Sequence, residues 1–178
     1  IYDGTTVIGS TTATGGGTWT FTSPTLTDGS HTLTVTVTDE VGNVSTSAPT
    51  VVRIDGTPPQ PVSDLLLQNN SGSTPTTIAN GGTTNDSTPL LSGKAEAGST
   101  VTVYEGTTVL GTAVADTNGN WSVATTTLTD ATHSLTINVT DPAGNVSSNA
   151  SATLTVDTST PAQVLTFAIY NNANTTPV

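Results

Sequence analysis

The acidic side chains are the residues of this sequence most suited to chemistry, because many of them stand where carboxylates could meet in loops. The chain has 13 Asp and Glu residues, 2 Lys and Arg residues, 2 His and no Cys. Crowded carboxylates repel one another unless a hard cation neutralises them, and Ca²⁺ takes about six to eight oxygen ligands. The acids therefore raise two hypotheses, a calcium site and ordinary solvated loop acids.

The other reactive residue types predict no catalytic centre. Without Cys there is no thiolate to act as a nucleophile or as a soft-metal ligand. The sequence has no Gly-x-Ser-x-Gly elbow and no phosphate-binding Gly-Lys loop. Its paired carboxylates fall in loops rather than in a cleft with apolar or aromatic walls. We therefore expect that the protein is not an enzyme.

The histidines and tryptophans have the pattern of structural residues. His31 and His133 begin predicted strands in the same parity as apolar residues, which favours hydrogen-bonded corner histidines over zinc or catalytic ones. Trp19 and Trp121 share parity with apolar neighbours and are predicted to anchor the core. The alternative for the tryptophans is an exposed platform on which a sugar ring stacks.

Composition and charge narrow the function classes. The formal net charge is −11, and the two basic residues cannot form a surface that neutralises phosphates or anionic lipids. Binding to nucleic acid and insertion into a membrane are therefore not expected. The chain is rich in Thr, with 17 Gly and 10 Pro, which favours strands and turns over helices. We expect an all-β protein.

An internal repeat organises the chain, because an offset of 102 residues aligns it with itself without a gap. Tyr2–Val7 matches Tyr104–Val109, and both the Trp and the His residues coincide. The predicted domains are the C-terminal part of one copy at 1–54, a complete copy at 55–156 and the start of another at 157–178. Because Ile1 falls in mid-strand, we expect a piece of a longer protein.

Short alternating runs in the complete copy predict seven strands, the number of an Ig-like β-sandwich. Leu135, Ile137 and Val139 share one face of their strand and are predicted to lie in the core with Leu154. The seven strands are 62–67, 89–95, 100–105, 109–115, 121–126, 133–140 and 146–156.

Following these strands from end to end gathers most acids at the two poles of the sandwich. The entering linker with Asp55 shares one pole with Glu96, Asp116 and Asp141, and Asp28 or Asp3 of the first copy approaches it. Asp157 is predicted to lie at the opposite pole, where the chain leaves the sandwich. The predicted calcium ligands at the junctions are Asp28, Asp55, Glu96, Asp116, Asp141 and Asp157.

Two loop motifs carry alternative interpretations. Asp116–Asn120 is similar to the first half of an EF-hand loop but lacks the distal Glu, so a tight hairpin turn with positive φ is predicted and Asp116 is an optional outer ligand. The loops Asp39–Asn43 and Asp141–Asn145 share an Asp-x-x-Gly-Asn pattern that suits a structural turn. Asp141 is either a calcium ligand or a turn acid.

Several segments together resemble a known family. They are Asp55–Pro59, Thr88–Val103, Asp116–Trp121 and Thr140–Ser147, and they are similar to the bacterial Ig-like repeats of giant surface adhesins. The resemblance implies tandem repeats in adhesins and biofilm proteins, often secreted by a type I system, with calcium stiffening the junctions. It also implies an extracellular location on the bacterial cell surface.

We therefore expect a structural spacer, in which a calcium-stiffened rod of neighbouring repeats presents a distal adhesive region. The alternatives are a repeat that itself binds a glycan or a host or matrix protein, and a repeat that self-associates in a filament or biofilm matrix.

Overall fold

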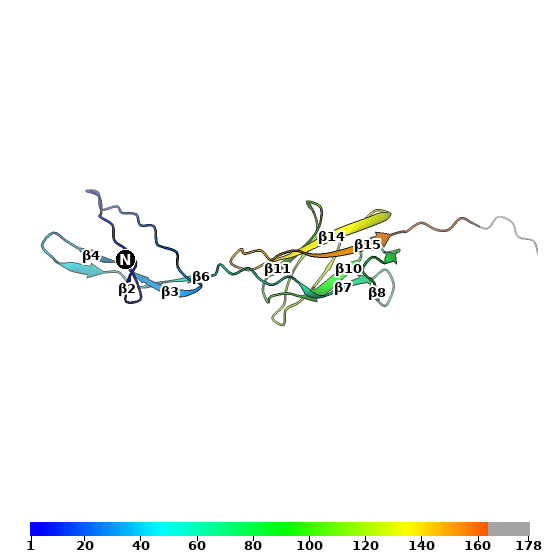
Figure 1. The fold of residues 1–178 in the computed structure, drawn as a ribbon, viewed down its shortest axis with the longest axis horizontal. Coiled ribbons are helices and arrows are strands. Elements are labelled where there is room, and N and C mark those ends of the chain that lie inside the picture. Colours follow the sequence, from blue (N-terminus) through cyan, green and yellow to red (C-terminus); the bar gives the residue numbers. More distant parts are fainter. Residues whose placement is uncertain (164–178) are drawn as a thin grey trace, which may run out of the picture.

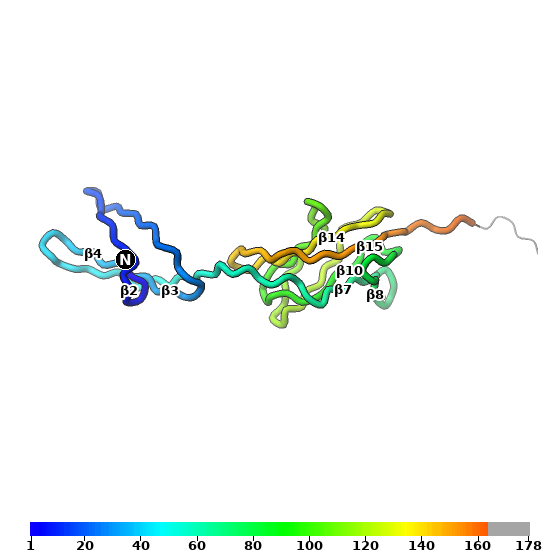
Figure 2. The backbone as a smooth tube through the Cα atoms, viewed as in Figure 1, coloured from blue at the N-terminus to red at the C-terminus, as the bar shows by residue number. Residues whose placement is uncertain are grey.

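The computed structural model describes residues 1–163, and all the regular structure in that range is β. The strands form two groups that follow one another along the long axis of the molecule (Figures 1 and 2). The first unit contains β1–β6, the second unit contains β7–β15, and residues 55–62 form the linker between them. Residues 1–163 contain no helix that could span a membrane. The prediction of an all-β, Ig-like fold is confirmed.

The second unit is a sandwich of two sheets. One has the strand order β13-β10-β7-β8, and the other has the order β12-β11-β14-β15-β9. The pairing is antiparallel, except that β9 joins the edge of β15 in parallel. The bounds are β7 Ser63–Asn69, β8 Thr76–Ile78, β9 Thr83–Thr84, β10 Leu90–Lys94, β11 Thr100–Glu105, β12 Thr108–Val114, β13 Asn120–Ala124, β14 Ala131–Thr140 and β15 Ala150–Val156.

Alternation along the strands builds the core between the two sheets. On β14, Leu135, Ile137 and Val139 are each buried, while the residues between them are more exposed. They face Leu91 on β10 and Trp121 on β13 as members of the same buried cluster. The predicted core positions of β14 and β15 are therefore confirmed.

Trp121 lies against a glycine that the sheet requires. Gly93 on β10 pairs with Trp121 on β13, and a Cβ added at Gly93 would stand 2.7 Å from the Ser63 carbonyl oxygen and 3.3 Å from the indole ring. The flat ring thus packs over the backbone of β10, and the indole is 4% exposed. A larger residue at Gly93 would push these strands apart.

The first unit has the same local pairings but less of the sandwich. Its strands form one sheet in the order β2-β1-β3-β6 and a separate β4-β5 hairpin. Their bounds are β1 Tyr2–Asp3, β2 Thr6–Val7, β3 Gly29–Thr34, β4 Thr36–Thr38, β5 Val44–Thr46 and β6 Thr50–Ile54. Residues 18–22, which correspond to β13, have no strand partner in this unit.

Three expectations about the fold need correction. Trp19 is 45% exposed rather than a core anchor, because the first unit has no strand corresponding to β10 to pack against it. The second unit has two short strands, β8 and β9, in addition to the seven predicted ones, and both lie between β7 and β10. Residues Asp116–Asn120 do not close a hairpin, because they lead from β12 in one sheet to β13 in the other. The predicted start of a further copy at 157–178 extends beyond residue 163 and lies largely outside the described residues.

Candidate functional site

Three loops share one self-contained geometry, and two of them, Asp116–Asn120 and Asp141–Asn145, lie at the pole of the second unit that receives the linker. In Asp141–Asn145, the Asp141 N–H donates to the Asn145 carbonyl oxygen at 3.0 Å, and the Gly144 N–H donates to the Asp141 carbonyl oxygen at 3.1 Å. The Asp141 carboxylate accepts the Asn145 backbone N–H at 2.9 Å and its side-chain amide at 2.8 Å. Asp39–Asn43 and Asp116–Asn120 repeat these bonds.

The glycine of each loop provides the backbone conformation that the turn needs. Gly119 has a φ of +77°, and Gly144 has a φ of +97°. The predicted positive φ in the Asp116–Asn120 turn is confirmed. A Cβ at Gly119 would also lie 2.5 Å from the Ala95 carbonyl oxygen, so this turn packs directly on the loop after β10.

These hydrogen bonds stabilise the charged carboxylates. Side-chain and backbone bonds from Asn145 lower the pKa of Asp141, and the corresponding bonds from Asn120 lower the pKa of Asp116. Asn43 lowers the pKa of Asp39 in the same way. The carboxylates are thus held ionised by donors from their own loops.

Asp28 binds the linker from the first unit. One carboxylate oxygen accepts the Gly56 N–H at 2.8 Å, and the other accepts the Thr57 hydroxyl at 2.5 Å. The Thr57 hydroxyl and the Gly56 N–H lower the pKa of Asp28. Asp28 therefore lies where the sequence predicts it, at the junction, but protein donors occupy its oxygens.

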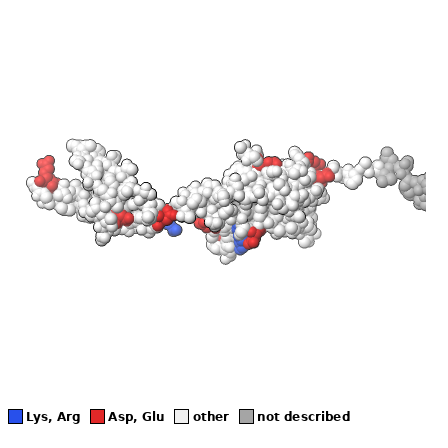
Figure 3. Space-filling model, in the orientation of Figure 1, with Lys and Arg blue, Asp and Glu red and all other residues white. Residues whose placement is uncertain are grey.

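The second unit contacts the same linker through an amide. The side-chain amide of Asn145 donates to the Asp55 carbonyl oxygen at 2.9 Å. Around this contact, a shallow open groove is lined by Arg53, Asp55, Glu96, Ala97, Pro142 and Ala143. Acidic and basic side chains lie close together at this narrow part of the molecule (Figure 3).

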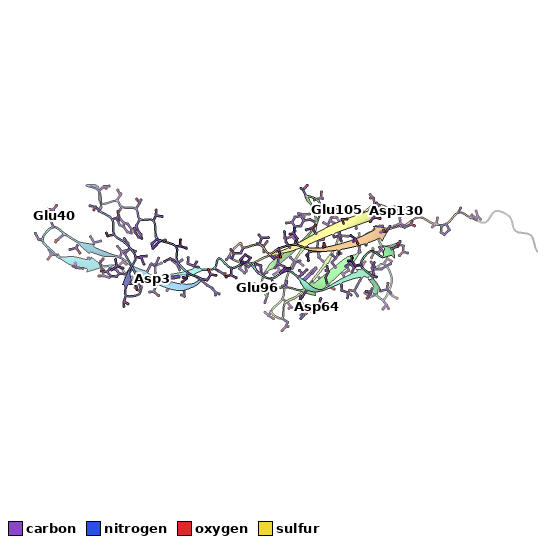
Figure 4. The ribbon with its side chains drawn as sticks, viewed as in Figure 1. Asp3, Glu40, Asp64, Glu96, Glu105 and Asp130 are labelled. Carbon is purple, nitrogen blue, oxygen red and sulfur yellow. The ribbon has the colours of Figure 1, made fainter. Side chains whose placement is uncertain are left out.

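The opposite pole of the second unit repeats the arrangement of Asp28. Asp130 accepts the Thr158 N–H at 3.0 Å and the Thr158 hydroxyl at 2.7 Å. The adjacent Asp157 accepts the Ser159 N–H at 3.0 Å, and the Ser159 side chain lowers the pKa of Asp157. Figure 4 shows Asp130 and Glu105 toward this end of the unit and Glu96 near the linker.

The six predicted calcium ligands do not form one site. Asp55 and Glu96 line the same groove, Asp28 and Asp141 lie at the same junction, Asp116 is bound within its turn, and Asp157 lies at the far pole. Within residues 1–163, no group of three or more His, Cys, Asp or Glu residues could hold a metal ion. Arg53, one of two basic residues in the chain, also lines the groove. A calcium ion needs several carboxylates that are free to coordinate it, and the calcium site stays a prediction.

Each histidine connects an acidic residue on the neighbouring strand with the loop that precedes the histidine's own strand. His133 is buried, its Nδ1 lies 2.9 Å from Glu105 Oε1, and its Nε2 lies 2.9 Å from the Thr129 carbonyl oxygen. His31 makes the same pair of contacts, with the Asp3 carboxylate and, at 2.8 Å, with the Thr27 carbonyl oxygen. The Asp3 carboxylate is therefore a hydrogen-bonding partner of His31.

Two residues at the junctions escaped prediction. The loop pattern predicts a turn at Asn145 and does not predict its contact with the linker. No role is predicted for Asp130. The signal for Asp130 was present, because Asp28 and Asp130 stand 102 residues apart and each precedes its Gly56 or Thr158 partner by 28 residues.

Comparison with known proteins identifies relatives at the level of the domain. The family model described as "Bacterial Ig-like domain" matches residues 1–56 and again 57–158. No curated protein matches the chain.

Two solved structures resemble parts of the fold. The fibronectin(III)-like modules of Clostridium thermocellum CbhA are 19% identical, with a TM-score of 0.46, and the match covers 87% of this chain and 75% of that one. CopC from Methylosinus trichosporium OB3b is 13% identical, with a TM-score of 0.32, and covers 44% of this chain and 85% of its own. Neither bears on function at this level of similarity.

Proposed function

The chain belongs to the bacterial Ig-like domain family, and from this membership we propose that it is a spacer segment of a large extracellular adhesin. Ig-like and fibronectin-like modules are typically structural rather than catalytic. In this proposal, neighbouring repeats of the same protein are the main partners. The array lies on the surface of a bacterial cell and carries a distal adhesive region away from it.

One observation carries the proposal, namely that the linker and the exit lie at opposite poles of the second unit. Asn145 contacts the linker at one pole, while Asp130 holds Thr158 at the other. Units joined through opposite poles extend in one direction, so each added copy lengthens the array. A binding module would have no need of this end-to-end arrangement.

The competing function is direct binding of a glycan or a matrix protein through exposed aromatic residues. Trp19 is the observation in its favour, since it is 45% exposed beside an open groove that includes Val35 and Val37. The corresponding residues of the second unit, Trp121, Ile137 and Val139, are buried core. The exposed face around Trp19 therefore consists of residues that form the sandwich core in the second unit. This correspondence favours the spacer over a binding surface.

The two functions are separated by a binding assay on the chain. Immobilised glycans and matrix proteins are incubated with the chain and with the variant Trp19→Ala. The spacer proposal expects no saturable binding by either. Saturable binding by the chain that Trp19→Ala abolishes would replace the spacer by a binding module.

A further inference from the structure

We propose that hydrogen bonds from both units set the direction of the linker, with Asp28 holding Gly56 and Thr57 and Asn145 holding Asp55, and that no bound cation is needed. The same device, built on Asp130, sets the direction of the chain that leaves the second unit. This inference concerns how the junction is held and does not depend on the proposed spacer function.

The contacts fall on three consecutive linker residues. Asp28 accepts two donors, the Gly56 N–H and the Thr57 hydroxyl, so it fixes both the backbone and a side chain. Immediately before them, the Asp55 carbonyl oxygen accepts the Asn145 amide from the second unit. A segment held from both sides at adjacent residues has little freedom to rotate.

We call the hydrogen bonding of the departing chain by Asp28, and by Asp130 in the second copy, the clamp. Its recurrence in both copies argues against a chance contact. Asp130 binds the Thr158 N–H and hydroxyl at 3.0 and 2.7 Å, and Asp28 binds the Gly56 N–H at 2.8 Å. The carboxylate and its backbone donor are 28 residues apart in each case. The first copy has Gly56 at the position of Thr158. Its hydroxyl donor to the aspartate is therefore the next residue, Thr57.

Each clamping aspartate stands on a loop that a histidine holds. The carbonyl of Thr27, directly before Asp28, lies 2.8 Å from His31 Nε2. The carbonyl of Thr129, directly before Asp130, lies 2.9 Å from His133 Nε2. The histidine therefore restrains the backbone from which the carboxylate reaches the linker.

On the other side of the junction, Asn145 is also restrained. The Asp141 carboxylate accepts both its backbone N–H and its side-chain amide, at 2.9 and 2.8 Å. The second N–H of that amide donates to the Asp55 carbonyl oxygen. Asp141 therefore acts on the linker by positioning Asn145.

Protein donors and one basic residue lie beside the acidic side chains at this junction. Protein N–H and O–H donors stabilise the Asp28 and Asp141 carboxylates, and Arg53 lines the groove with Asp55 and Glu96. The repulsion that would call for a calcium ion is thus reduced without one. Of the predicted calcium ligands, Asp28 and Asp141 already use their carboxylate oxygens in these hydrogen bonds, so at these two residues the two accounts compete.

Paired spin labels on the chain test the clamp directly. The sequence has no Cys, so Thr50→Cys on β6 and Thr112→Cys on β12, both at exposed positions, allow selective labelling. The distribution of distances between the labels reports the relative orientation of the units. We expect Asp28→Ala to broaden this distribution. Asp130→Ala, the matched control at the far pole, should leave it unchanged.

The same labelled chain separates the clamp from a cation. Chelator should not broaden the wild-type distribution, and added Ca²⁺ should not restore Asp28→Ala. If Asp28→Ala leaves the distribution unchanged, or if chelator broadens the wild-type distribution, the inference is overturned.

Amide hydrogen exchange provides a readout that does not require a rigid first unit. Loss of the acceptor should accelerate exchange about five- to tenfold at Gly56 in Asp28→Ala and at Thr158 in Asp130→Ala, with no effect at the other site. Unchanged exchange at Thr158 in Asp130→Ala, while β14 and β15 stay protected, would contradict the clamp in the complete unit.

Discussion

Trp19 and Trp121 stand 102 residues apart at corresponding positions, and their exposed fractions are 45% and 4%. The difference arises from the neighbouring sheet, since Trp121 packs on Gly93 of β10 and the first unit has no such strand. The exposure of each indole thus shows whether its unit has an opposing sheet: the first unit leaves Trp19 uncovered, and the second unit buries Trp121.

The first prediction compares alanine substitutions at these tryptophans. Trp121→Ala should destabilise the second unit by about 3–5 kcal/mol, because it empties a large aromatic site in a packed core. Trp19→Ala should change stability by less than about 0.5 kcal/mol, as is usual for exposed positions. Urea denaturation followed by circular dichroism measures both. A loss below about 1 kcal/mol for Trp121→Ala would mean that the core does not depend on this indole.

The second prediction concerns closure of the first unit. An additional copy of residues 57–102 fused before Ile1 should supply the strands corresponding to β7 and β10 and bury Trp19. The Trp19 emission should shift to shorter wavelength and become less accessible to acrylamide, measured in a Trp121→Phe background. The matched control carries Leu in place of the glycine corresponding to Gly93, which should obstruct the ring. Equal quenching in the fusion, the control and the unfused chain would count against this register.

The third prediction concerns acid. The folded pKa values of Asp28, Asp116 and Asp141 are lowered, so their hydrogen bonds stabilise the protein fully above about pH 4. That contribution is lost as the pH falls through the lowered folded pKa values. Denaturation across a pH series should show this decline, and Asp141→Asn should reduce it. An identical acid dependence in wild type and Asp141→Asn would exclude Asp141 from the effect.

The fourth prediction concerns His31, whose two ring nitrogens both face acceptors. The Asp3 carboxylate and the Thr27 carbonyl raise its pKa, because the doubly protonated imidazolium can donate to both. This stabilisation is complete below about pH 6.5 and is lost as the pH rises through the raised folded value. An NMR titration should place the pKa of His31 above the ordinary value of 6.5, and Asp3→Asn should lower it. A His31 pKa unaffected by Asp3→Asn would refute the pairing.

The sequence predicts the seven long strands of the second unit because buried strands alternate in polarity, as Leu135, Ile137 and Val139 show. Alternation is absent from Thr76–Ile78 and Thr83–Thr84, and β9 exists through its long-range parallel pairing with β15. Parity also places Trp19 on the correct face, but it cannot tell whether the opposing sheet is present.

The acids show a different limit of the sequence. Tracing the strands correctly brings Asp28, Asp55, Glu96 and Asp141 to one junction. What spacing cannot show is the direction of a carboxylate: that of Asp28 turns toward the linker, and that of Asp141 turns toward N–H groups of its own loop. The Asp-x-x-Gly-Asn pattern occurs three times in this chain, Asp116–Asn120 included, and this recurrence is itself a signal for self-contained turns.

The central claim is that the units extend end to end through a junction held by the protein itself. Small-angle X-ray scattering of the chain fused to the additional copy of residues 57–102, in calcium and in chelator, tests it most directly. The account predicts an elongated particle, with a maximum dimension close to that of two sandwiches in line, and the same profile under both conditions. A compact particle, or an elongated one that becomes compact or broadly bent when calcium is removed, would contradict it.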